Sequence, residues 1–440
     1  MSLGVRAMFA SFAQLQVTGH NIANAGVDGY SRQEAELASA KGQFTGAGFF
    51  GKGVDVVTVS RAHDAFLTRE AANASSLAAM DRTRFEQLTR LEEVFPMGER
   101  GLGYAAQQFL NAMVDLASRP QDASTREVVL ARADDLAARF NLAARQLDGL
   151  QAGVTQDLNH SVATVNEIAQ RIADVNQQIA MVKGLGQPPN DLLDQRDRLV
   201  QQLSGYLQVS TIPADDGTLG VFIAGGQRLV LGNQAQPLQV VPDPLDASRS
   251  ALGIVEAGGV RPLTADLLTG GSIAGLLRFQ NEDLAAARES IDGMAAAFAD
   301  AVNAQHALGD DLDGNPGDDV FDYGGGVAGA ARALTLNITD PRRIAAAAAG
   351  QPTTNNDNAR ALAALRDAAV VDGQTITDAY ASAMAGVAEA AEQQRAAKAG
   401  VNLDEEAARL IQFQQAYQAA AKVLQVAQSV FDTLLSTAAR

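Results

Sequence analysis

The feature that most constrains the fold is an apolar repeat that runs without a break from residue 136 to residue 182. Its members are separated by steps of three or four residues, so they share one side of an α-helix. They are Leu136, Phe140, Ala143, Leu147, Leu150, Val154, Leu158, Val162, Val165, Ile168, Ile172, Val175, Ile179 and Val182. A repeat this long exceeds an ordinary globular helix and predicts a rod-like, coiled-coil-like bundle. Gly149 and Gly153 lie inside it and indicate either a bend or a close crossing of another helix.

The carboxyl-terminal segment carries two such repeats side by side. The first contains Leu403, Leu410, Tyr417, Leu424 and Phe431 at intervals of seven residues, each divided into steps of four and three by an intervening Ala or Gln, and the second contains Phe413, Val423, Val430 and Leu434. Two adjacent repeats predict one helix with two packing partners. We therefore take these nine residues as a candidate assembly interface. The alternative is an ordinary amphipathic core helix.

The amino-terminal segment has a shorter repeat of the same kind, formed by Val5, Met8, Phe12, Leu15, Gly19 and Ile22. It ends at residues 24–29, a cluster of turn-forming residues. After it, residues 30–60 are rich in glycine and contain short alternating runs, which we read as strands or extended arms. The apolar members of this repeat, together with Asn21 and Asn24, complete the candidate assembly interface.

Between the two ends the patterns predict further elements. Helices are expected over residues 62–94, 104–118, 190–207, 272–306, 358–366 and 377–399, with Asn190 or Asp191 as the N-cap of the third. Residues 208–270 contain short β-type runs separated by glycine turns, which predicts a small β domain. Residues 307–344 are expected to form loops and short strands, and the alanine run 345–349 a loop or a helix edge.

Charge and composition exclude several classes of function. The chain carries 34 basic and 51 acidic residues, a net charge of −17, which disfavours binding to nucleic acids and to anionic membranes. It has no cysteine, so disulfides, thiolate metal sites and thiol catalysis are excluded. Neither a cleavable signal sequence nor a membrane-spanning apolar run is recognisable. These features fit a cytosolic protein or one exported without a cleaved signal.

Few residues are candidates for catalysis or for binding a metal ion or a phosphate group. His20, His63, His160 and His306 are too scattered for a metal site, so no metal and no cofactor is expected. Asp191, Asp194 and Asp197 share one helix side beside Arg196 and Arg198, which favours capping and ion pairing over acid–base catalysis. Residues 311–322 resemble a calcium loop, but Pro316 and Asp322 stand where glycine and glutamate belong. We read this segment as an acidic turn. The glycine-rich stretches 46–53 and 324–326 lack the frame of a phosphate-binding loop.

Residues 20–33, His-Asn-Ile-Ala-Asn-Ala-Gly-Val-Asp-Gly-Tyr-Ser-Arg-Gln, resemble the signature of bacterial flagellar rod, hook and hook-associated proteins, although Val27-Asp28 replace the usual Thr-Pro. Residues 190–197 and 401–408, with the Tyr-Gln-Ala-Ala-Ala of residues 417–421, resemble the hook-associated branch. Residues 313–317 and 355–359 are also similar to it. The resemblance extends over the whole chain, and the combination of segments is more specific than the first signature alone.

The resemblance implies a structural protein rather than an enzyme, located at the junction between the flagellar hook and the filament. It implies export by the flagellar type III apparatus and a secreted, extracellular location. The implied partners are copies of the chain itself in a ring, the hook protein, a second hook–filament junction protein and an export chaperone on the C-terminal helix.

We therefore expect a mainly α fold with a small β domain, arranged as a nested, out-and-back helical bundle. Residues 1–35 and 400–440 would form a terminal coiled-coil inner layer. Residues 36–207 and 271–399 would form the long-helix domain, with 208–270 as the outer β domain. Three rivals remain: another axial rod or hook protein, a secreted enzyme on a flagellar-type stalk using the acids of residues 311–322, and a cytosolic coiled-coil adaptor.

Overall fold

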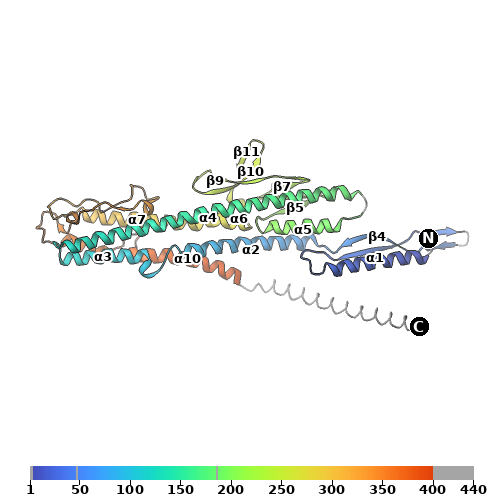
Figure 1. The fold of residues 1–440 in the computed structure, drawn as a ribbon, viewed down its shortest axis with the longest axis horizontal. Coiled ribbons are helices and arrows are strands. Elements are labelled where there is room, and N and C mark those ends of the chain that lie inside the picture. Colours follow the sequence, from blue (N-terminus) through green and yellow to red (C-terminus); the bar gives the residue numbers. More distant parts are fainter. Residues whose placement is uncertain (1–2, 46–47, 185–186, 400–440) are drawn as a thin grey trace, which may run out of the picture. The chain divides into compact units, whose positions relative to one another are not determined.

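The computed structural model describes residues 3–45, 48–184 and 187–399 (Figure 1). The chain forms two compact units, residues 1–394 and 395–440, and the elements described below belong to the first except for the end of its last helix. Helices dominate these residues, and the strands form small separate sheets, as the sequence predicts. None of the helices in the described ranges is long and apolar enough to cross a membrane.

The long apolar repeat forms a single helix, α4 (Ala123–Lys183), of 61 residues. It would span about 90 Å at 1.5 Å per residue. Asp122 is its N-cap, because its side chain accepts a hydrogen bond from the backbone N–H of Ser124. All members of the predicted repeat are buried except Leu150 and Val182, which are half-buried. The prediction of a long, one-sided helix is therefore confirmed.

The expected close crossing at Gly149 and Gly153 is wrong. A Cβ atom added to either glycine would meet no other atom within 4 Å, apart from those of neighbouring residues and of the helix backbone itself. Both positions therefore lie in open space beside α4, and no neighbouring helix requires glycine there.

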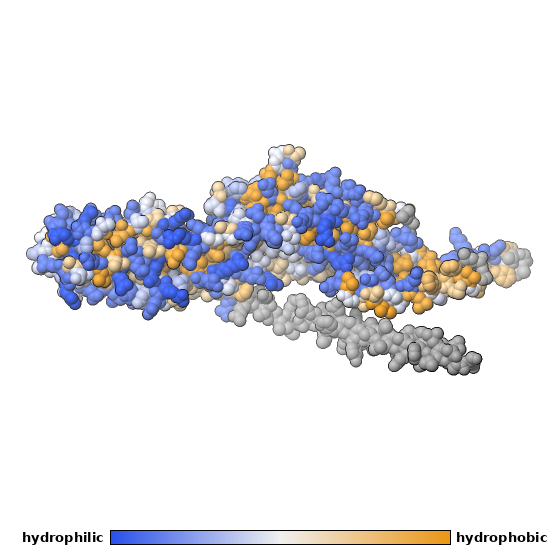
Figure 2. Space-filling view, in the orientation of Figure 1, coloured by the Kyte–Doolittle hydropathy of each residue, from blue (hydrophilic) through white to orange (hydrophobic). Residues whose placement is uncertain are grey.

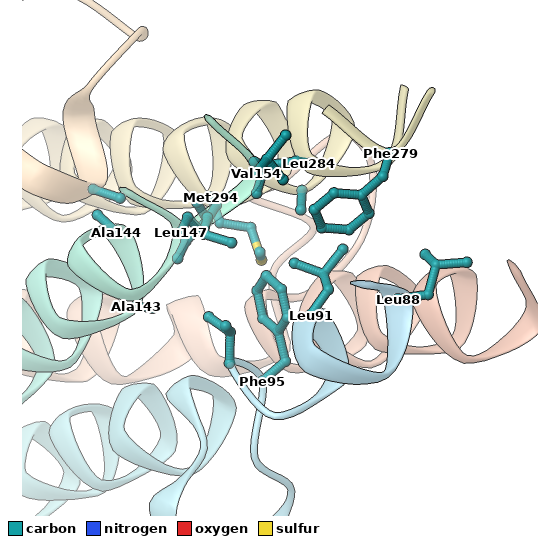
Figure 3. Close-up of a cluster of buried hydrophobic side chains, with 14 of the residues drawn as sticks. Leu88, Leu91, Phe95, Ala143, Ala144, Leu147, Val154, Phe279, Leu284 and Met294 are labelled. Atoms are coloured by element: carbon teal, nitrogen blue, oxygen red, sulfur yellow. The ribbon is translucent and has the colours of Figure 1, made fainter. Parts of the chain in front are cut away.

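The helices α2 (Ala65–Glu92), α3 (Leu102–Ser118), α5 (Asn190–Ser204) and α7 (Leu284–His306) all pack against α4. Figure 3 shows how their apolar side chains meet: Leu91, on α2, and Phe95, just beyond its end, point toward Leu284 and Met294 of α7 and Leu147 of α4. This core is continuous along the bundle and accounts for most of the buried apolar side chains.

The predicted helix 272–306 is observed, but it is built in three parts. Helix α6 (Ser272–Arg278) passes through a π-helical turn (Phe279–Asp283) into α7. Gly271, with a φ of 84°, begins it, and a Cβ there would lie 2.2 Å from the backbone of Tyr206. Only glycine fits both the conformation and the close approach.

The remaining helices are α1 (Leu3–Ala23), α8 (Ala330–Ala333), α9 (Asp357–Ala364) and α10 (Ile376–Ala399). Four very short strands accompany them: β12 (Gly309–Asp310), β13 (Phe321–Asp322), β14 (Thr335–Leu336) and β15 (Ala347–Ala348). The alanine run 345–349 is neither loop nor helix edge throughout, because Ala347 and Ala348 pair with β12 and the first three alanines are buried. Small side chains allow this close packing.

The predicted β region contains seven strands in two sheets. The first has the order β5 (Ser210–Pro213), β6 (Leu219–Ile223), β7 (Gln227–Leu231) and β8 (Gln234–Ala235). The second has the order β11 (Gly259–Pro262), β10 (Ser250–Glu256) and β9 (Leu238–Pro242). All pairs are antiparallel. That this region is a separate domain remains a prediction.

Side-chain amides attach these sheets to the helices. Asn166 of α4 donates to the carbonyl of Leu238 (2.9 Å) and accepts from its N–H (2.8 Å). Asn176 does the same for Leu219, and Gln280 of the π-helical turn does so for Ser250. Each amide thus imitates a neighbouring β-strand, and it satisfies backbone groups that would be costly to bury unpaired. We call such a side chain an amide clamp.

The predicted side-chain cap of α5 is wrong. Its N-cap is Pro189, and no side chain closes the helix start. Asn190 instead donates its amide to the carbonyl of Val59 (2.7 Å), and Asp191 binds residues of the amino-terminal segment described next. Both side chains are therefore used for contacts between elements rather than for local capping.

Candidate assembly interface

Helix α1 lies along a two-stranded ribbon formed by β1 (Gln33–Ser39) and β4 (Val54–Arg61), which β2 (Gln43–Thr45) and β3 (Gly48–Phe50) extend as a hairpin. The contact begins near Leu3, 3.7 Å from the Cβ position of Gly53, and includes an ion pair of 2.6 Å between Arg6 and Asp55. It ends at Asn21, beside Gln33. We call α1 and these four strands the arm.

The face of α1 toward the ribbon is not the predicted stripe. The best covered side chains of the helix include Arg6, Ala10, Ala13, Val17 and Asn21. Their steps of three and four residues are also a helical repeat. This repeat is weak in the sequence, because alanine and asparagine are less apolar than leucine and phenylalanine.

The predicted stripe lies on the exposed side of α1. Met8, Phe12, Leu15 and Ile22 are 58–70% exposed, and only Val5 is half-buried. Phe9 adds to the same surface. Figure 2 shows the resulting concentration of hydrophobic residues where Figure 1 places α1. The described part of the chain therefore does not cover this stripe.

The two asparagines predicted for the interface are used within the chain. Asn21 is a fourth amide clamp, since it donates to the carbonyl of Gln33 (2.8 Å) and accepts from its N–H (2.8 Å) and from the hydroxyl of Tyr30 (2.7 Å). Asn24 donates to the carbonyl of His20 (3.0 Å). Both side chains hold the turn between α1 and β1 and thereby set the direction of the ribbon.

The arm is attached to α5 by a cluster of polar contacts around Asp194, whose side chain is 3% exposed. Asp194 accepts from the backbone N–H of Ser31 (3.0 Å) and pairs with Arg61 (2.8 Å). Arg61 also pairs with Asp197 (2.6 Å). Asp191 accepts from Gln33 (3.1 Å). Two of the segments that resemble flagellar proteins, 20–33 and 190–197, thus bind each other.

The predicted ion pairing is confirmed for Asp194 and Asp197, but their partner is Arg61 rather than Arg196 or Arg198. Arg196 is buried and donates to the carbonyl of Gly217 (2.8 Å) and to Asn176 (3.3 Å), while Arg198 donates to the carbonyl of Asp28 (3.3 Å). Burial lowers the pKa of Arg196. Burial, and then the charges of Asp191 and Asp194, raise the pKa of Tyr30. No local pattern could have predicted Arg61 as the partner, because it lies more than a hundred residues away.

The acidic segment 311–322 is organised by its own backbone and by arginines. Asp311 accepts from the N–H groups of Asp313 (2.8 Å) and Asn315 (2.9 Å). Asp313 pairs with Arg342, and Asp318 pairs with Arg343. Within the described ranges no three His, Cys, Asp or Glu side chains are grouped so as to hold a metal ion.

His306 is buried and bridges two backbone segments, at Asp318 and at Ala345. Its Nδ1 lies 2.6 Å from the carbonyl of Asp318, and its Nε2 accepts from the N–H of Ala345 (2.8 Å). Burial, followed by the nearby charge of Arg126, lowers the pKa of His306 to about 4. The ring is therefore neutral near pH 7, with Nδ1 as the donor.

The candidate interface residues of the C-terminal segment lie outside the described residues. These are Leu403, Leu410, Phe413, Tyr417, Val423, Leu424, Val430, Phe431 and Leu434. Their role stays a prediction from sequence.

Comparison with known proteins gives the family. Residues 88–321 match the model of the flagellar hook-associated protein FlgK helical domain. The chain is 30% identical to flagellar hook-associated protein 1 of Salmonella typhimurium, over 97% of each chain. The chain belongs to the flagellar hook-associated protein 1 family. A second member, from Bacillus subtilis, is 27% identical over 98% of this chain and 96% of its own.

Two further matches concern the C-terminal segment and the fold. Residues 392–437 match the model of the flagellar basal body rod FlgEFG protein C-terminal region. The fold resembles that of the flagellar hook junction protein FlgK from Burkholderia pseudomallei, with a TM-score of 0.71, 20% identity and coverage of 80% of this chain and 99% of that one. The family, the mainly α fold with small sheets and the structural role in the flagellum are thus confirmed.

Proposed function

We propose that this chain joins the flagellar hook to the filament by self-assembly through its terminal helices. The observation that carries the proposal is the stripe of Met8, Phe12, Leu15 and Ile22 on α1, which is exposed while the opposite face of the helix is docked. An apolar surface of this kind marks an interaction site. Burying each of these side chains would gain about 1.5–3 kcal/mol.

The partner of the stripe in this proposal is the C-terminal helix of residues 400–440, of the same copy or of a neighbour in the ring. One of its two apolar repeats would pack against α1. The other would bind a neighbouring subunit or, before export, a chaperone. Assembly next to the hook protein and a second junction protein would place the chain outside the cell, after export by the flagellar type III apparatus. Residues 1–35 and 400–440 would then form the inner layer, and 208–270 the outer domain.

We further propose that the chain is not an enzyme. The acidic segment 311–322 is the best candidate for a rival active site, and Asp311, Asp313 and Asp318 within it are engaged with backbone N–H groups, Arg342 and Arg343, respectively. The relatives from Salmonella typhimurium and Bacillus subtilis are named as flagellar hook-associated proteins, not as enzymes.

The test replaces Phe12 with Asp in a strain that expresses the variant from the native locus. We expect hooks without filaments, flagellin shed into the medium and at least a tenfold loss of swarming, because the carboxylate cannot enter an apolar seam. Gln14→Asp is the matched control, since Gln14 is exposed on another side of the same helix. Wild-type swarming by the Phe12→Asp strain would contradict the proposal.

A further inference from the structure

One side of helix α2 is buried near its end and exposed near its beginning. Phe66, Leu77 and Leu88 follow one another at intervals of eleven residues, about three turns of an α-helix, so they share one side of α2. Leu88 is 1% exposed, Leu77 is 45% exposed and Phe66 is 61% exposed. Leu67, next to Phe66, is also exposed. The apolar surface therefore continues beyond the part of α2 that other elements cover.

Helix α10 packs beside the buried part of this side. Ala390 of α10 and Leu88 of α2 line the same hollow, and Ala390 packs against the core. Earlier in α10, the hydroxyl of Tyr380 donates to the carbonyl of Pro96, just beyond the end of α2 (2.8 Å). Helix α10 therefore runs antiparallel to α2, toward the start of that helix, with Ala390 at the level of Leu88 (Figure 1).

The sequence after α10 has the length to cover the exposed part. Two antiparallel helices rise by the same 1.5 Å per residue, so positions that start level stay level. Eleven residues beyond Ala390 the chain reaches Val401, at the level of Leu77. Eleven residues further it reaches Gln412, at the level of Phe66. The described part of α10 ends just before Val401.

A helical continuation would leave the predicted assembly repeat free. Val401, Glu405 and Ala408 are separated by steps of four and three residues, so they would face α2 together. Leu403 and Leu410 are about half a turn away from them and would point away from α2. The same side of the segment therefore does not have to serve both contacts.

Charge also favours this segment as the occupant. Beside the start of α2 is a hollow whose charged lining side chains are basic except for one, namely Arg61, His63, Arg69, Arg196 and Asp197. The acids of residues 404–406 would lie about one turn from Arg69 in this register, and Arg409 would lie at the level of Glu70. An acidic segment with apolar side chains thus suits a surface that is apolar and bordered by basic groups.

We propose that residues 401–412 continue α10 and pack antiparallel on the exposed side of α2 in the same chain. The contact goes beyond the proposed function, because it forms within one free chain. It leaves residues 413–440 for the inner layer. As a helix these span about 42 Å at 1.5 Å per residue, enough to cover α1, whose 21 residues span about 31 Å. The contact on α2 would fix where this assembling helix begins.

The absence of cysteine from the chain allows a clean cross-linking test. The double variant Leu77→Cys, Val401→Cys is purified as a dilute monomer, oxidised and analysed on a non-reducing gel. A disulfide needs Cα atoms within about 7 Å, so we expect a faster-migrating monomer that a reductant reverses. The matched control pairs Leu77→Cys with Gln425→Cys, about 36 Å further along the helix at 1.5 Å per residue, and should react at least tenfold more slowly.

The other outcomes are separable. A cross-linked dimer would assign the exposed side of α2 to a second copy and overturn the proposal, as would equal rates in variant and control. The proposed function fails independently, through wild-type swarming of the Phe12→Asp strain. A cross-link in the free chain together with such swarming would leave only this inference standing.

A second measurement disturbs the surface without a cross-link. Leu77→Asp should raise the amide exchange rate of residues 401–412 in the free chain at least tenfold, because a carboxylate replaces the apolar contact. The melting temperature should stay unchanged, since Leu77 is partly exposed. Ala71→Asp is the matched control, at an exposed position on another side of α2. Equal exchange rates of residues 401–412 in the two variants would overturn the proposal.

Discussion

Helices α1 and α4 carry the same kind of apolar repeat but use it differently. The repeat of α4 is covered by α3, α5, α6, α7 and the β9 region of the same chain. The repeat of α1 is exposed, and its weaker repeat of small side chains packs on the ribbon. A spacing of three and four residues therefore predicts which side of a helix is apolar. It does not predict whether the partner belongs to the same molecule.

The strongest test of this difference between α1 and α4 is to place the same charge in both repeats. Leu147→Asp in α4 puts a carboxylate at a position with no exposure, and we expect it to cost more than about 4 kcal/mol or to prevent folding. Leu15→Asp in α1 should change the free energy of unfolding by less than about 0.5 kcal/mol, because Leu15 is exposed. Urea unfolding of both purified variants measures the difference. Similar losses would mean that the α1 stripe is buried in the free chain.

The attachment between the arm and α5 should show the next largest effect. Asp194→Ala leaves Arg61 with Asp197 alone and frees the N–H of Ser31, and it should cost about 3 kcal/mol. We expect the loss in the arm, so amide exchange should accelerate in residues 30–61 more than in α4. Asp191→Ala is the control, because Asp191 is exposed and its contact with Gln33 is at the surface. Uniform acceleration over both regions would show that arm and bundle unfold together.

Acid should weaken the region around His306 by about 2 kcal/mol at pH 5. The folded pKa of about 4 lies below the ordinary value of 6.5, so the unfolded chain binds the proton more tightly. The stabilisation from the neutral ring is thus complete above pH 6.5 and is lost as pH falls from 6.5 toward 4, at 1.36 kcal/mol per unit. Unfolding measured at pH 7 and pH 5 should show this slope, and His306→Gln should remove it. An unchanged slope in the variant would assign the acid sensitivity to other groups.

The smallest expected effect on stability comes from removing an aromatic ring from the exposed repeat of α1, compared with removing one from the covered repeat of α4. Phe12→Ala should change the free energy of unfolding by no more than about 0.5 kcal/mol, while Phe140→Ala, in the covered repeat, should cost about 3–5 kcal/mol. Calorimetry of the two purified variants provides the measurement. The Phe12→Ala chain should nevertheless compete poorly with wild type for hook ends. Equal incorporation would remove the stripe from the interface.

The sequence predicted most of the helical fold and little of the attachment site. Leu147 and the other members of the apolar repeat predict α4, because their spacing can be read from the neighbouring sequence alone. The partnership of Asp194 with Arg61 and Ser31 depends on how distant segments fold together, and nothing near Asp194 indicates it. Asn190 illustrates the same limit: its residue type favours a cap, but a carbonyl of β4 offers a tertiary contact that overrides the local preference.

The amide clamps affect how the chain behaves when many copies are packed close together. A ribbon of two strands has open edges, and an open edge readily pairs with any other exposed strand. Asn21 occupies both the N–H and the carbonyl of Gln33, and Asn166 occupies both groups of Leu238 on the outer strand of its sheet. At these two points a foreign strand finds no free hydrogen-bonding group. Where many identical chains lie side by side, these blocked strand edges disfavour backbone pairing between neighbouring copies. Association then depends on contacts between side chains.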